Sequence, residues 1–436
     1  MLFSIIASTA VWILIALFII RVVYSSGCPA NASDDKIIKL ALAPNMRGKG
    51  YTPANKDYVR VAVYAAIFRI VVFLISIMIM RFYIDGSEPL TMDRFLSEWE
   101  KWDANNYIRI ASLGYSGYQE EGMYTTLVFF PLYSWVMKLF YSLVLDMRAA
   151  GLIVSTLCYI AGCCFFYGAI APDYGKNVAE RAVILISVFP FSMFFGTIFP
   201  ESIFFMLCAI CIFYLRRQNW AIASVAGMLA SLSRMQGIIL LVVILIEWCE
   251  YYKPIELIRT KKTNELIKAV FTKLSWILLV PVGLLVYFYI NYSVSGDAFK
   301  FLEYQEKVWN NGSQYFGETF ITIWDKACGV KASGQLIFTS GIVPVFLLVL
   351  SIAVMFYCYR KVHNKYLVFM LLYTIMCYVL KDLISAGRYI SVSFPLFLGL
   401  AVFLEEHPKA EKITIVLSSV MFGAVLYAYL TFKHIL

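Results

Sequence analysis

Long apolar runs separated by short polar stretches recur along the chain, from Leu2 to Phe432. A helix needs about 20 mostly apolar residues to cross a hydrocarbon core about 30 Å thick, and many of these runs reach or approach that length. The pattern predicts an all-α, polytopic membrane protein with about 11–12 spans. The clearest predicted spans are 2–24, 61–84, 149–170, 182–199, 274–292, 336–358, 366–382, 389–404 and 412–432.

One part of the pattern departs from a simple row of spans. Between Ser202 and Trp248 the apolar sequence is interrupted by Arg216-Arg217 and by the polar stretch 231–237. These interruptions favour three short helices over two long ones. Short, interrupted helices in a membrane usually surround a cavity.

The segment 126–145 is apolar enough to cross the membrane, and the distribution of charge decides against it. When it lies on the surface, more than half of the 37 Lys and Arg residues share one side, in the loops 25–60, 171–181, 216–219, 249–273, 359–365 and 405–412. The positive-inside rule assigns these loops to the cytoplasm. We therefore expect 126–145 to form an amphipathic surface helix in the first outer loop, with Lys138 turned to water.

Composition supports this topology and excludes several function classes. Hydrophobic residues make up 61% of the 436 residues and charged residues 15%, which is too apolar for a large water-soluble domain. The net charge of +9 follows from the basic inner loops, so it does not indicate nucleic-acid binding. Most of the ten cysteines lie inside apolar runs and the three histidines are scattered, so we expect no metal site.

The topology divides the chain into two parts. Residues 1–60 form an extra N-terminal span with a basic inner loop, and residues 61–436 form the transmembrane catalytic domain. Two predicted outer loops of that domain, 85–148 and 293–335, are long enough to carry chemistry. We expect these loops and the shorter outer turns to converge on one face of the membrane.

Asp103 is the strongest candidate for a chemical role in the first outer loop. It follows Trp102 and lies just upstream of Asn106 and Tyr107, immediately beyond a membrane helix. Partial desolvation makes a carboxylate more basic, which suits it to take a proton from an attacking hydroxyl group. The alternative is an interfacial aromatic belt in which Asp103 is solvated or caps a helix.

Charged residues at predicted helix breaks are the next candidates. Arg234 is flanked by apolar stretches, so its side chain either reaches the interface or faces a polar cavity that holds an anion. Arg388 and Lys381 share another outer turn and offer a second phosphate-binding possibility. Glu201 begins a helix, where it either interacts with the helix dipole, orients a sugar hydroxyl or pairs with Arg234.

The remaining candidates have side chains suited to carbohydrate. Gln236 follows Arg234, and the second outer loop contains Gln305 and Trp309, a mixture of amides and a stacking ring that an ordinary loop could also have. No G-x-G-x-x-G, G-x-x-x-x-G-K-[ST], G-x-S-x-G or Asp-x-Asp occurs in the sequence. A nucleotide-sugar donor held through a divalent ion is therefore not expected, and neither is a cofactor.

Several of these motifs together resemble the PIG-V-like mannosyltransferases, the family of GPI mannosyltransferase 2 and its bacterial relatives. The resemblance lies in Trp102-Asp103 with Asn106-Tyr107, Gly114-Tyr115, Phe129-Phe130-Pro131, Phe199-Pro200-Glu201-Ser202, Ser233-Arg234-Met235-Gln236-Gly237 and Gly387-Arg388-Tyr389. It covers roughly 60–405. Gln236 replaces the usual Asn and Pro200 the usual Thr, and residues 1–60 have no counterpart that we recognise.

This resemblance implies a GT-C-type helical bundle that transfers a hexose, mannose by the family name, from a polyprenyl-phosphate donor. The acceptor is a hydroxyl group of a lipid, glycan or protein, and the reaction inverts the sugar. By the family pattern, the base is an acidic residue of the first outer loop, here Asp103. A phosphate leaving group needs no proton, so one or two cations, Arg234 with or without Arg388, would suffice to stabilise it. We expect Trp102, Asn106, Tyr107, Glu201, Gln236, Gln305 and Trp309 to contact substrate.

Two functions from other classes remain open on the sequence. A transporter or lipid flippase also has broken helices, but it usually places acidic residues at the bilayer midplane and often has inverted repeats. A structural membrane subunit could use Trp102 and Asp103 as an interface. As an enzyme, the protein would act on the extracytoplasmic side of a bacterial plasma membrane or, in a eukaryote, of the endoplasmic reticulum membrane.

Overall fold

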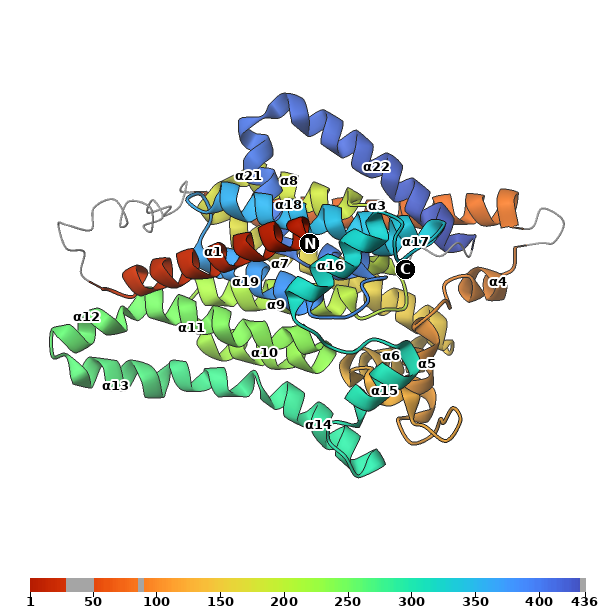
Figure 1. Ribbon diagram of the computed structural model, residues 1–436, viewed down its shortest axis with the longest axis horizontal. Helices are drawn as coiled ribbons and strands as arrows, with labels where there is room; N and C mark the ends of the chain where they lie inside the picture. Colours follow the sequence, from red (N-terminus) through yellow and green to blue (C-terminus); the bar gives the residue numbers. More distant parts are fainter. Residues whose placement is uncertain (29–50, 85–89, 432–436) are drawn as a thin grey trace.

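The computed structural model describes residues 1–28, 51–84 and 90–431, and within these ranges the chain is almost entirely helical (Figure 1). The longer helices are α1 (Leu2–Ser25), α3 (Asn55–Ile79), α5 (Ala104–Leu113), α6 (Pro131–Val144), α7 (Met147–Tyr174), α8 (Lys176–Val188), α9 (Glu201–Arg216), α10 (Trp220–Ser233), α11 (Ile239–Tyr252), α13 (Thr263–Thr272), α14 (Val282–Ser295), α15 (Lys300–Trp309), α16 (Phe316–Ala327), α18 (Val343–Cys358), α19 (Asn364–Tyr378), α21 (Phe394–Glu406) and α22 (Pro408–Leu430). Short helices and turns join them, namely η2 (Met80–Ile84), α4 (Met92–Ser97), η3 (Thr125–Val128), η4 (Ser192–Gly196), η5 (Met235–Ile238), α12 (Pro254–Arg259), η6 (Leu274–Leu279), α17 (Gln335–Ile337), η7 (Phe338–Ile342) and α20 (Ala386–Ser391).

Seven helical stretches in these described ranges are long and apolar enough to cross a membrane. They are Leu2–Ser25, Asn55–Tyr83, Met147–Tyr174, Met235–Tyr252, Thr263–Ser295, Gln335–Cys358 and Pro408–Leu430. The prediction of an all-helical, multi-pass membrane protein is confirmed.

Other apolar helices are shorter than a full span. α8, α9, α19 and α21 contain 13, 16, 15 and 13 residues. At 1.5 Å per residue they are about 20–24 Å long, against a hydrocarbon core of about 30 Å. The spans expected at 182–199, 366–382 and 389–404 correspond to helices of this kind. α8 ends before Pro190, because the residue before a proline is disfavoured in a helix.

Three helices occupy 202–248, as the interrupted sequence predicted. Arg216-Arg217 ends α9, and Arg234 stands at the break between α10 and η5, with an extended backbone (φ −157°). The Asn219 side chain accepts a hydrogen bond from the Ile222 amide and caps the start of α10. The second break therefore leaves Arg234 at the end of a helix that stops within the bundle.

The centre of the bundle is formed by helices that are buried on most sides. α7 packs along α9, and two glycines of α7 allow the close approach: Gly151 lies against Ile198 and Gly162 against Phe205. α8 and α21 pack against one another beside this pair. Exposed apolar side chains are instead common on α1, α3 and α22, as expected of helices that face lipid.

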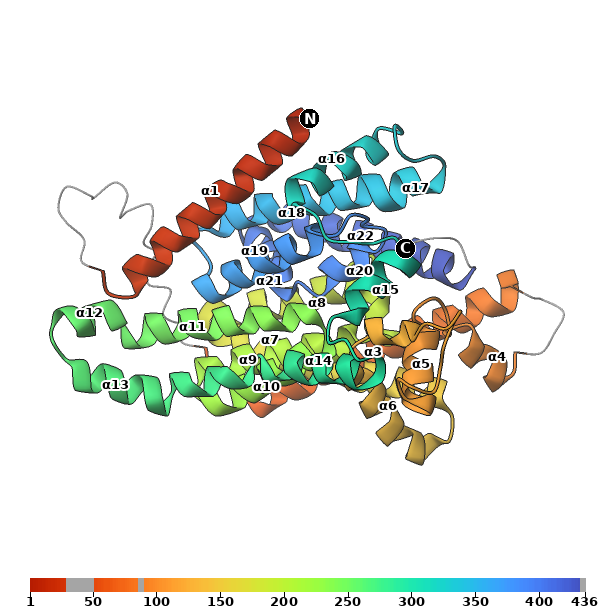
Figure 2. The ribbon, with the colours of Figure 1, turned by 60° about the horizontal axis from the view of Figure 1, so that its bottom comes forward.

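α5, α6 and α15 lie together at the end of the bundle opposite the α12–α13 hairpin (Figure 2). α6 has only 14 residues; one face is buried, and the Tyr133 hydroxyl donates to the Gly151 carbonyl of α7. Lys138 and Leu139 on the other face are exposed. The segment 126–145 thus forms a short amphipathic helix that does not reach the length of a span.

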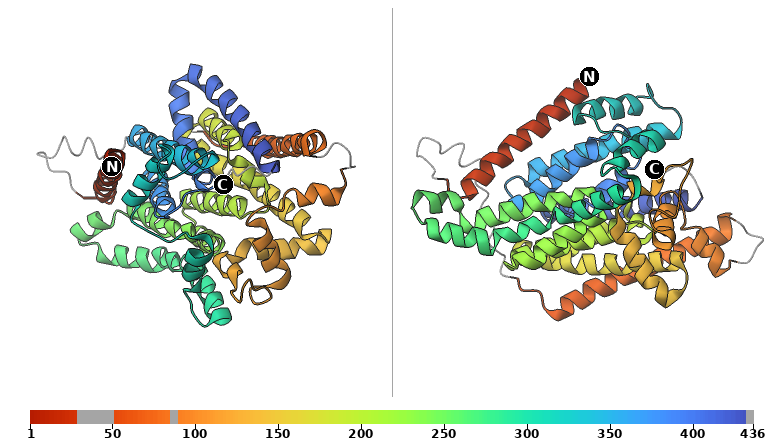
Figure 3. Two further views of the ribbon diagram at one scale, coloured as in Figure 1. Left: turned by 45° about the vertical axis from the view of Figure 1, so that its right-hand side comes forward. Right: turned by 90° about the horizontal axis from the view of Figure 1, so that it is seen from below.

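The N-terminal helix α1 runs along one flank of the bundle beside α16 (Figure 3). The Ser4 hydroxyl donates to the Gly317 carbonyl at 2.6 Å, and the Phe3 ring stacks on Trp324. The helical part of the predicted unit 1–60 is therefore packed against the rest of the chain. Most of its predicted basic loop, 29–50, lies outside the described residues.

Candidate active site

Four charged side chains from distant parts of the sequence meet where short helices begin or end. Asp103 immediately precedes α5, Glu201 is the first residue of α9, Arg234 follows α10, and Arg388 lies in α20. Each of these positions follows from a helix break that the sequence contains. We call Asp103, Glu201, Arg234 and Arg388 the charged quartet.

Carboxylates and guanidinium groups alternate through the quartet. Arg388 Nη1 lies 2.8 Å from Asp103 Oδ2, and Arg388 Nε lies 3.3 Å from Glu201 Oε1. The same Glu201 oxygen accepts a hydrogen bond from Arg234 Nη1 at 2.5 Å. Two acids and two bases thus form a single network with no net formal charge.

Exposure falls from one end of the quartet to the other. The Asp103 side chain is 23% exposed, Arg388 9%, Arg234 8% and Glu201 0%. Asp103 is therefore the member that a molecule outside the bundle can reach first. Glu201, at the buried end, has no exposed side-chain surface.

The sequence left open whether Asp103 caps a helix. It occupies the N-cap position of α5, yet its side chain makes no capping hydrogen bond and is paired with Arg388 instead. Trp102 just before it has a positive φ of 51°, an uncommon conformation for a large residue. This local backbone geometry turns Asp103 toward the bundle.

Burial and ionic partners act in opposite directions on Arg388. Burial alone would lower its pKa, but the carboxylates of Asp103 and Glu201 raise the pKa above its ordinary value. Arg388 therefore stays cationic under all physiological conditions. It is a fixed positive charge that can attract an anion.

One carboxylate oxygen of the quartet has no partner. Glu201 Oε2 is buried and lacks a hydrogen-bond partner among the described residues. An unpartnered buried acceptor costs free energy unless a water molecule or ligand group supplies a donor. A hydroxyl group of a bound substrate has the chemistry to satisfy it.

Aromatic rings line the quartet. The guanidinium carbons of Arg234 and Arg388 lie 5.4 and 5.2 Å from the centre of the Tyr389 ring, and that of Arg388 lies 5.0 Å from Phe199. Tyr389 was not among the residues expected to contact substrate. Its position directly after Arg388 in the sequence was the one available signal.

Two predicted substrate residues, Tyr107 and Trp309, lie in a row of rings that leads away from the quartet. The Tyr107 ring contacts Phe199 and Phe129, and Phe129 in turn contacts Trp309 on α15. Burial raises the pKa of the Tyr107 hydroxyl. Trp309 is therefore connected to Arg388 through three intervening rings, those of Phe129, Tyr107 and Phe199.

The other predicted residues are less closely connected. Trp102 packs edge-on against Tyr429 of α22. Asn106, Gln236 and Gln305 are half-buried, and within the described ranges none of them hydrogen-bonds a member of the quartet. Lys381, considered with Arg388 as a phosphate contact, instead pairs with Glu306 at the surface, 3.3 Å away.

The described residues contain no group of three or more His, Cys, Asp or Glu side chains that could hold a metal ion. The two carboxylates of the quartet are each engaged by an arginine. The positive charges available for an anionic substrate in this site are therefore those of Arg234 and Arg388.

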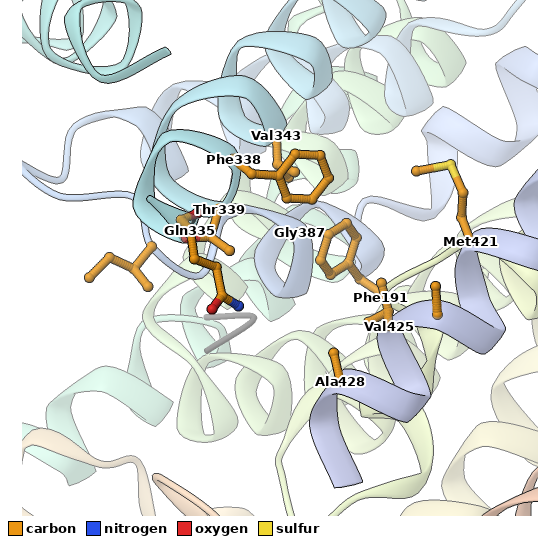
Figure 4. Close-up of a pocket in the computed structure, with 11 residues that line it drawn as sticks. Phe191, Gln335, Phe338, Thr339, Val343, Gly387, Met421, Val425 and Ala428 are labelled. Atoms are coloured by element: carbon orange, nitrogen blue, oxygen red, sulfur yellow. Dashed lines mark hydrogen bonds between the residues drawn. The ribbon is translucent and has the colours of Figure 1, made fainter. Parts of the chain in front are cut away.

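An apolar pocket of about 220 Å³ is lined in part by Gly387, the residue before Arg388 in the sequence (Figure 4). One side is formed by α22 and the other by η7 with Gln335 of α17, and Gly387, the neighbour of Arg388, lines the pocket between them. Phe338 and Met421 in its lining are each 48% exposed. The pocket therefore opens at the side of the bundle, on helices long and apolar enough to span the membrane.

Comparison with protein families identifies the chain. Residues 58–298, more than half of its length, match the family model of the mannosyltransferase PIG-V. The chain belongs to the PIG-V mannosyltransferase family. It is therefore a multi-pass membrane protein of a glycosyltransferase family, and the resemblance drawn from Trp102-Asp103 and the later motifs is confirmed. The matched region contains Asp103, Glu201 and Arg234, whereas Arg388 lies beyond it.

Solved structures of other membrane enzymes are distantly similar to this PIG-V family member. AglB, an oligosaccharyltransferase from Archaeoglobus fulgidus solved with an inhibitory peptide and a dolichol-phosphate, is 13% identical, with a TM-score of 0.42 over 87% of this chain and 56% of AglB. ArnT from Cupriavidus metallidurans in the apo state is 12% identical, with a TM-score of 0.47 over 86% of this chain and 76% of ArnT. The chain thus spans little more than half the length of AglB. No curated protein sequence matches it.

Proposed function

We propose that the protein transfers a hexose, mannose by the family name, from a polyprenyl-phosphate donor to a hydroxyl group of a lipid, glycan or protein acceptor. The observation that carries this proposal is the ion pair between Asp103 and Arg388 within the charged quartet. It supplies a base and a phosphate-binding cation side by side. Membership of the PIG-V family supports the same reaction class.

The chemistry needs few groups. An alkoxide leaving group must be protonated, so inverting hydrolysis of a glycoside uses two carboxyl groups. A phosphate leaving group carries its own stable negative charge and needs only cations. Asp103 takes the proton from the acceptor hydroxyl, whose oxygen bonds to the anomeric carbon as the bond to the phosphate oxygen breaks. One displacement of this kind inverts the sugar.

Arg388 and Arg234 bind the donor phosphate in this proposal. Both arginines already contact Glu201, which holds them side by side. A phosphate that approaches Arg388 competes with Asp103 for the same guanidinium group. Donor binding therefore frees the Asp103 carboxylate for the acceptor proton, and the base becomes available when the leaving group is in place.

The apolar pocket beside Gly387 suits the first part of the donor's isoprenoid chain. Its lining is mostly apolar, it opens on the lipid-facing side of α22, and it adjoins the residue that binds the phosphate. A polyprenyl phosphate needs an apolar path next to a cation, and this pocket with Arg388 offers both.

The carbohydrate is expected on the Asp103 side of the quartet. Trp102, Tyr107 and Trp309 offer ring faces or edges, and Asn106, Gln236 and Gln305 offer amides along the same region. The unpartnered Oε2 of Glu201 would accept a sugar hydroxyl. We place this site on the extracytoplasmic side of the membrane, following the distribution of basic loops.

The decisive experiment is a donor comparison with the purified protein in liposomes. Labelled polyprenyl-phosphate mannose, polyprenyl-phosphate glucose and GDP-mannose are each incubated with a membrane lipid extract, and labelled products are identified by mass spectrometry. We expect transfer from a polyprenyl-phosphate sugar and none from GDP-mannose in the absence of any other enzyme. Transfer from the nucleotide sugar alone would overturn the proposal.

A further inference from the structure

Arg69 is a buried cation in the middle of a membrane-spanning helix. It lies on α3, its exposed fraction is 1%, and none of its three guanidinium nitrogens has a hydrogen-bond partner among the described residues. A charged side chain at such a depth is costly and usually marks a functional position. The charged quartet does not include it.

The Arg69 guanidinium lies directly against Gly196. It occupies the space that a Cβ atom on Gly196 would need, so position 196 can carry no side chain while Arg69 stays where it is. The rings of Phe73 and Tyr159 flank the guanidinium, with centres 5.4 and 5.9 Å from its central carbon. Contacts of this kind partly offset the cost of burying the charge.

Gly196 belongs to the turn that leads into Glu201. η4 ends at Gly196, and the Ser155 hydroxyl on α7 donates to the Thr197 carbonyl at 2.7 Å. The Ser202 hydroxyl donates to the Phe195 carbonyl at 2.5 Å and so joins the turn to the first residues of α9. A shift at Gly196 is therefore passed directly to the backbone on either side of Glu201.

Asp103, the other carboxylate of the charged quartet, is connected to Arg69 through aromatic rings. Phe73, which lies under the guanidinium, contacts Trp99 edge-on with a centroid distance of 5.5 Å. Trp99 is fully buried and lies four residues before Asp103. Arg69 thus contacts one segment that leads to Glu201 and, through Phe73, the segment that leads to Asp103.

We propose that Arg69 is a positioning residue that fixes the η4 turn so that Glu201 holds Arg234 and Arg388 at phosphate-binding distance. The inference rests on the proposed function, because its readout is sugar transfer. Arg69 touches no reacting group and acts through the backbone around Gly196. The Arg69 guanidinium packs against the backbone of Gly196, where a Cβ atom would not fit. This contact fixes the position of the η4 turn.

The first test exploits this fit. Gly196→Ala adds a Cβ that the guanidinium excludes, and we expect sugar transfer to fall at least about tenfold. Arg69→Ala frees that space, so the double variant Arg69→Ala/Gly196→Ala should be more active than Gly196→Ala alone. Gly162→Ala, which adds a Cβ on α7 against Phe205 of α9, should not be rescued by Arg69→Ala.

The second test separates positioning from general stability. Arg69→Met should lower kcat/KM about tenfold in the wild-type background and less than about twofold in the Glu201→Gln background, because the group it positions is already gone. A merely structural role would lower activity equally in both. Yield and monodispersity in detergent identify any variant that fails to fold, and Arg69→Lys then replaces Arg69→Met.

The outcomes distinguish the two proposals. If the wild-type protein transfers no sugar from any polyprenyl-phosphate donor, the proposed function fails. If the wild type transfers sugar while Gly196→Ala retains full activity, or while Arg69→Met acts equally in both backgrounds, the positioning role of Arg69 is overturned. Rescue by the double variant together with the reduced effect in Glu201→Gln supports it.

Discussion

Arg388 donates a hydrogen bond to Asp103 across 2.8 Å, although 285 positions separate the two residues in the chain. Asp103 comes from the first long loop, and Arg388 comes from α20 in the C-terminal part of the sequence. The contact therefore forms only when the C-terminal helices are packed against the first loop. Folding of the whole chain is what brings the proposed base next to the proposed phosphate ligand.

Loss of the Asp103 carboxylate should abolish transfer. In Asp103→Asn the amide cannot accept the acceptor proton, and we expect turnover to fall by about 10²–10⁴. Glu100→Gln, which changes a half-buried acid of the same loop outside the quartet, is the matched control and should keep most activity. Initial rates of labelled-product formation measure both. Near-normal turnover of Asp103→Asn would remove the base from the mechanism.

Arg388 should be sensitive even to a conservative change. A lysine keeps the charge but presents a single ammonium group, which cannot contact Asp103 and Glu201 with separate nitrogens as the guanidinium does. We expect Arg388→Lys to raise the KM for the donor and to lower turnover. Lys381→Met, on the neighbouring turn and paired with Glu306, should leave both values close to those of the wild type. A larger effect of Lys381→Met than of Arg388→Lys on these two values would point to Lys381 as the phosphate ligand.

The candidate site was predictable from sequence only in part. Asp103, Arg234 and Arg388 stand out because a charge beside aromatic or apolar sequence needs a partner or a polar cavity. Sequence spacing could not show which charges pair, since Asp103 and Arg388 meet through tertiary packing alone. For the same reason Tyr389, named only as part of the motif Gly387-Arg388-Tyr389, was not expected to lie against both arginines.

The fold was predictable where the apolar runs are long and less so where they are short. The spans at α1, α7 and α22 follow from length and hydropathy, whereas α8 ends at Val188 because Pro190 and packing decide its end. Arg69 is also a charge inside an apolar run, but the sequence could not show that its side chain lies against Gly196. Its contact with Gly196 depends on the close packing of α3 against α7 and η4, which a hydropathy pattern does not contain.

Glu201 should contribute to stability as well as to activity. Glu201→Gln removes the negative charge that contacts two buried arginines, and we expect a loss of about 1–3 kcal/mol in the free energy of unfolding. The double variant Glu201→Gln/Arg234→Gln also removes Arg234, the cation that Glu201→Gln leaves without its ionic partner, so it should unfold at a higher temperature than Glu201→Gln alone. Thermal unfolding in detergent, monitored by intrinsic fluorescence, gives the unfolding temperatures of the wild type and the two variants. A single variant as stable as the wild type would contradict the ion-pair network.

Filling the apolar pocket should affect long donors selectively. Ala428→Trp places a large ring in the pocket beside Gly387, and we expect the KM for a long-chain donor to rise about tenfold, equivalent to about 1.4 kcal/mol. A donor with a chain of only two isoprene units should be used as well by the variant as by the wild type. Val420→Trp, on an exposed position of the same helix, is the matched control. Equal effects on short and long donors would mean that the lipid chain binds elsewhere.

The two ends of the bundle should face opposite sides of the membrane. Cys328 is exposed after α16, and Lys261 is exposed between α12 and α13. In a variant cleared of the other nine cysteines, Cys328 should react with an impermeant maleimide added to intact cells. Cysteine at 261, in a variant without Cys328, should react only after permeabilisation, because the basic segment 249–273 is expected in the cytoplasm. Reaction of both from one side would refute the assigned topology and, with it, the extracytoplasmic placement of Asp103 and Arg388.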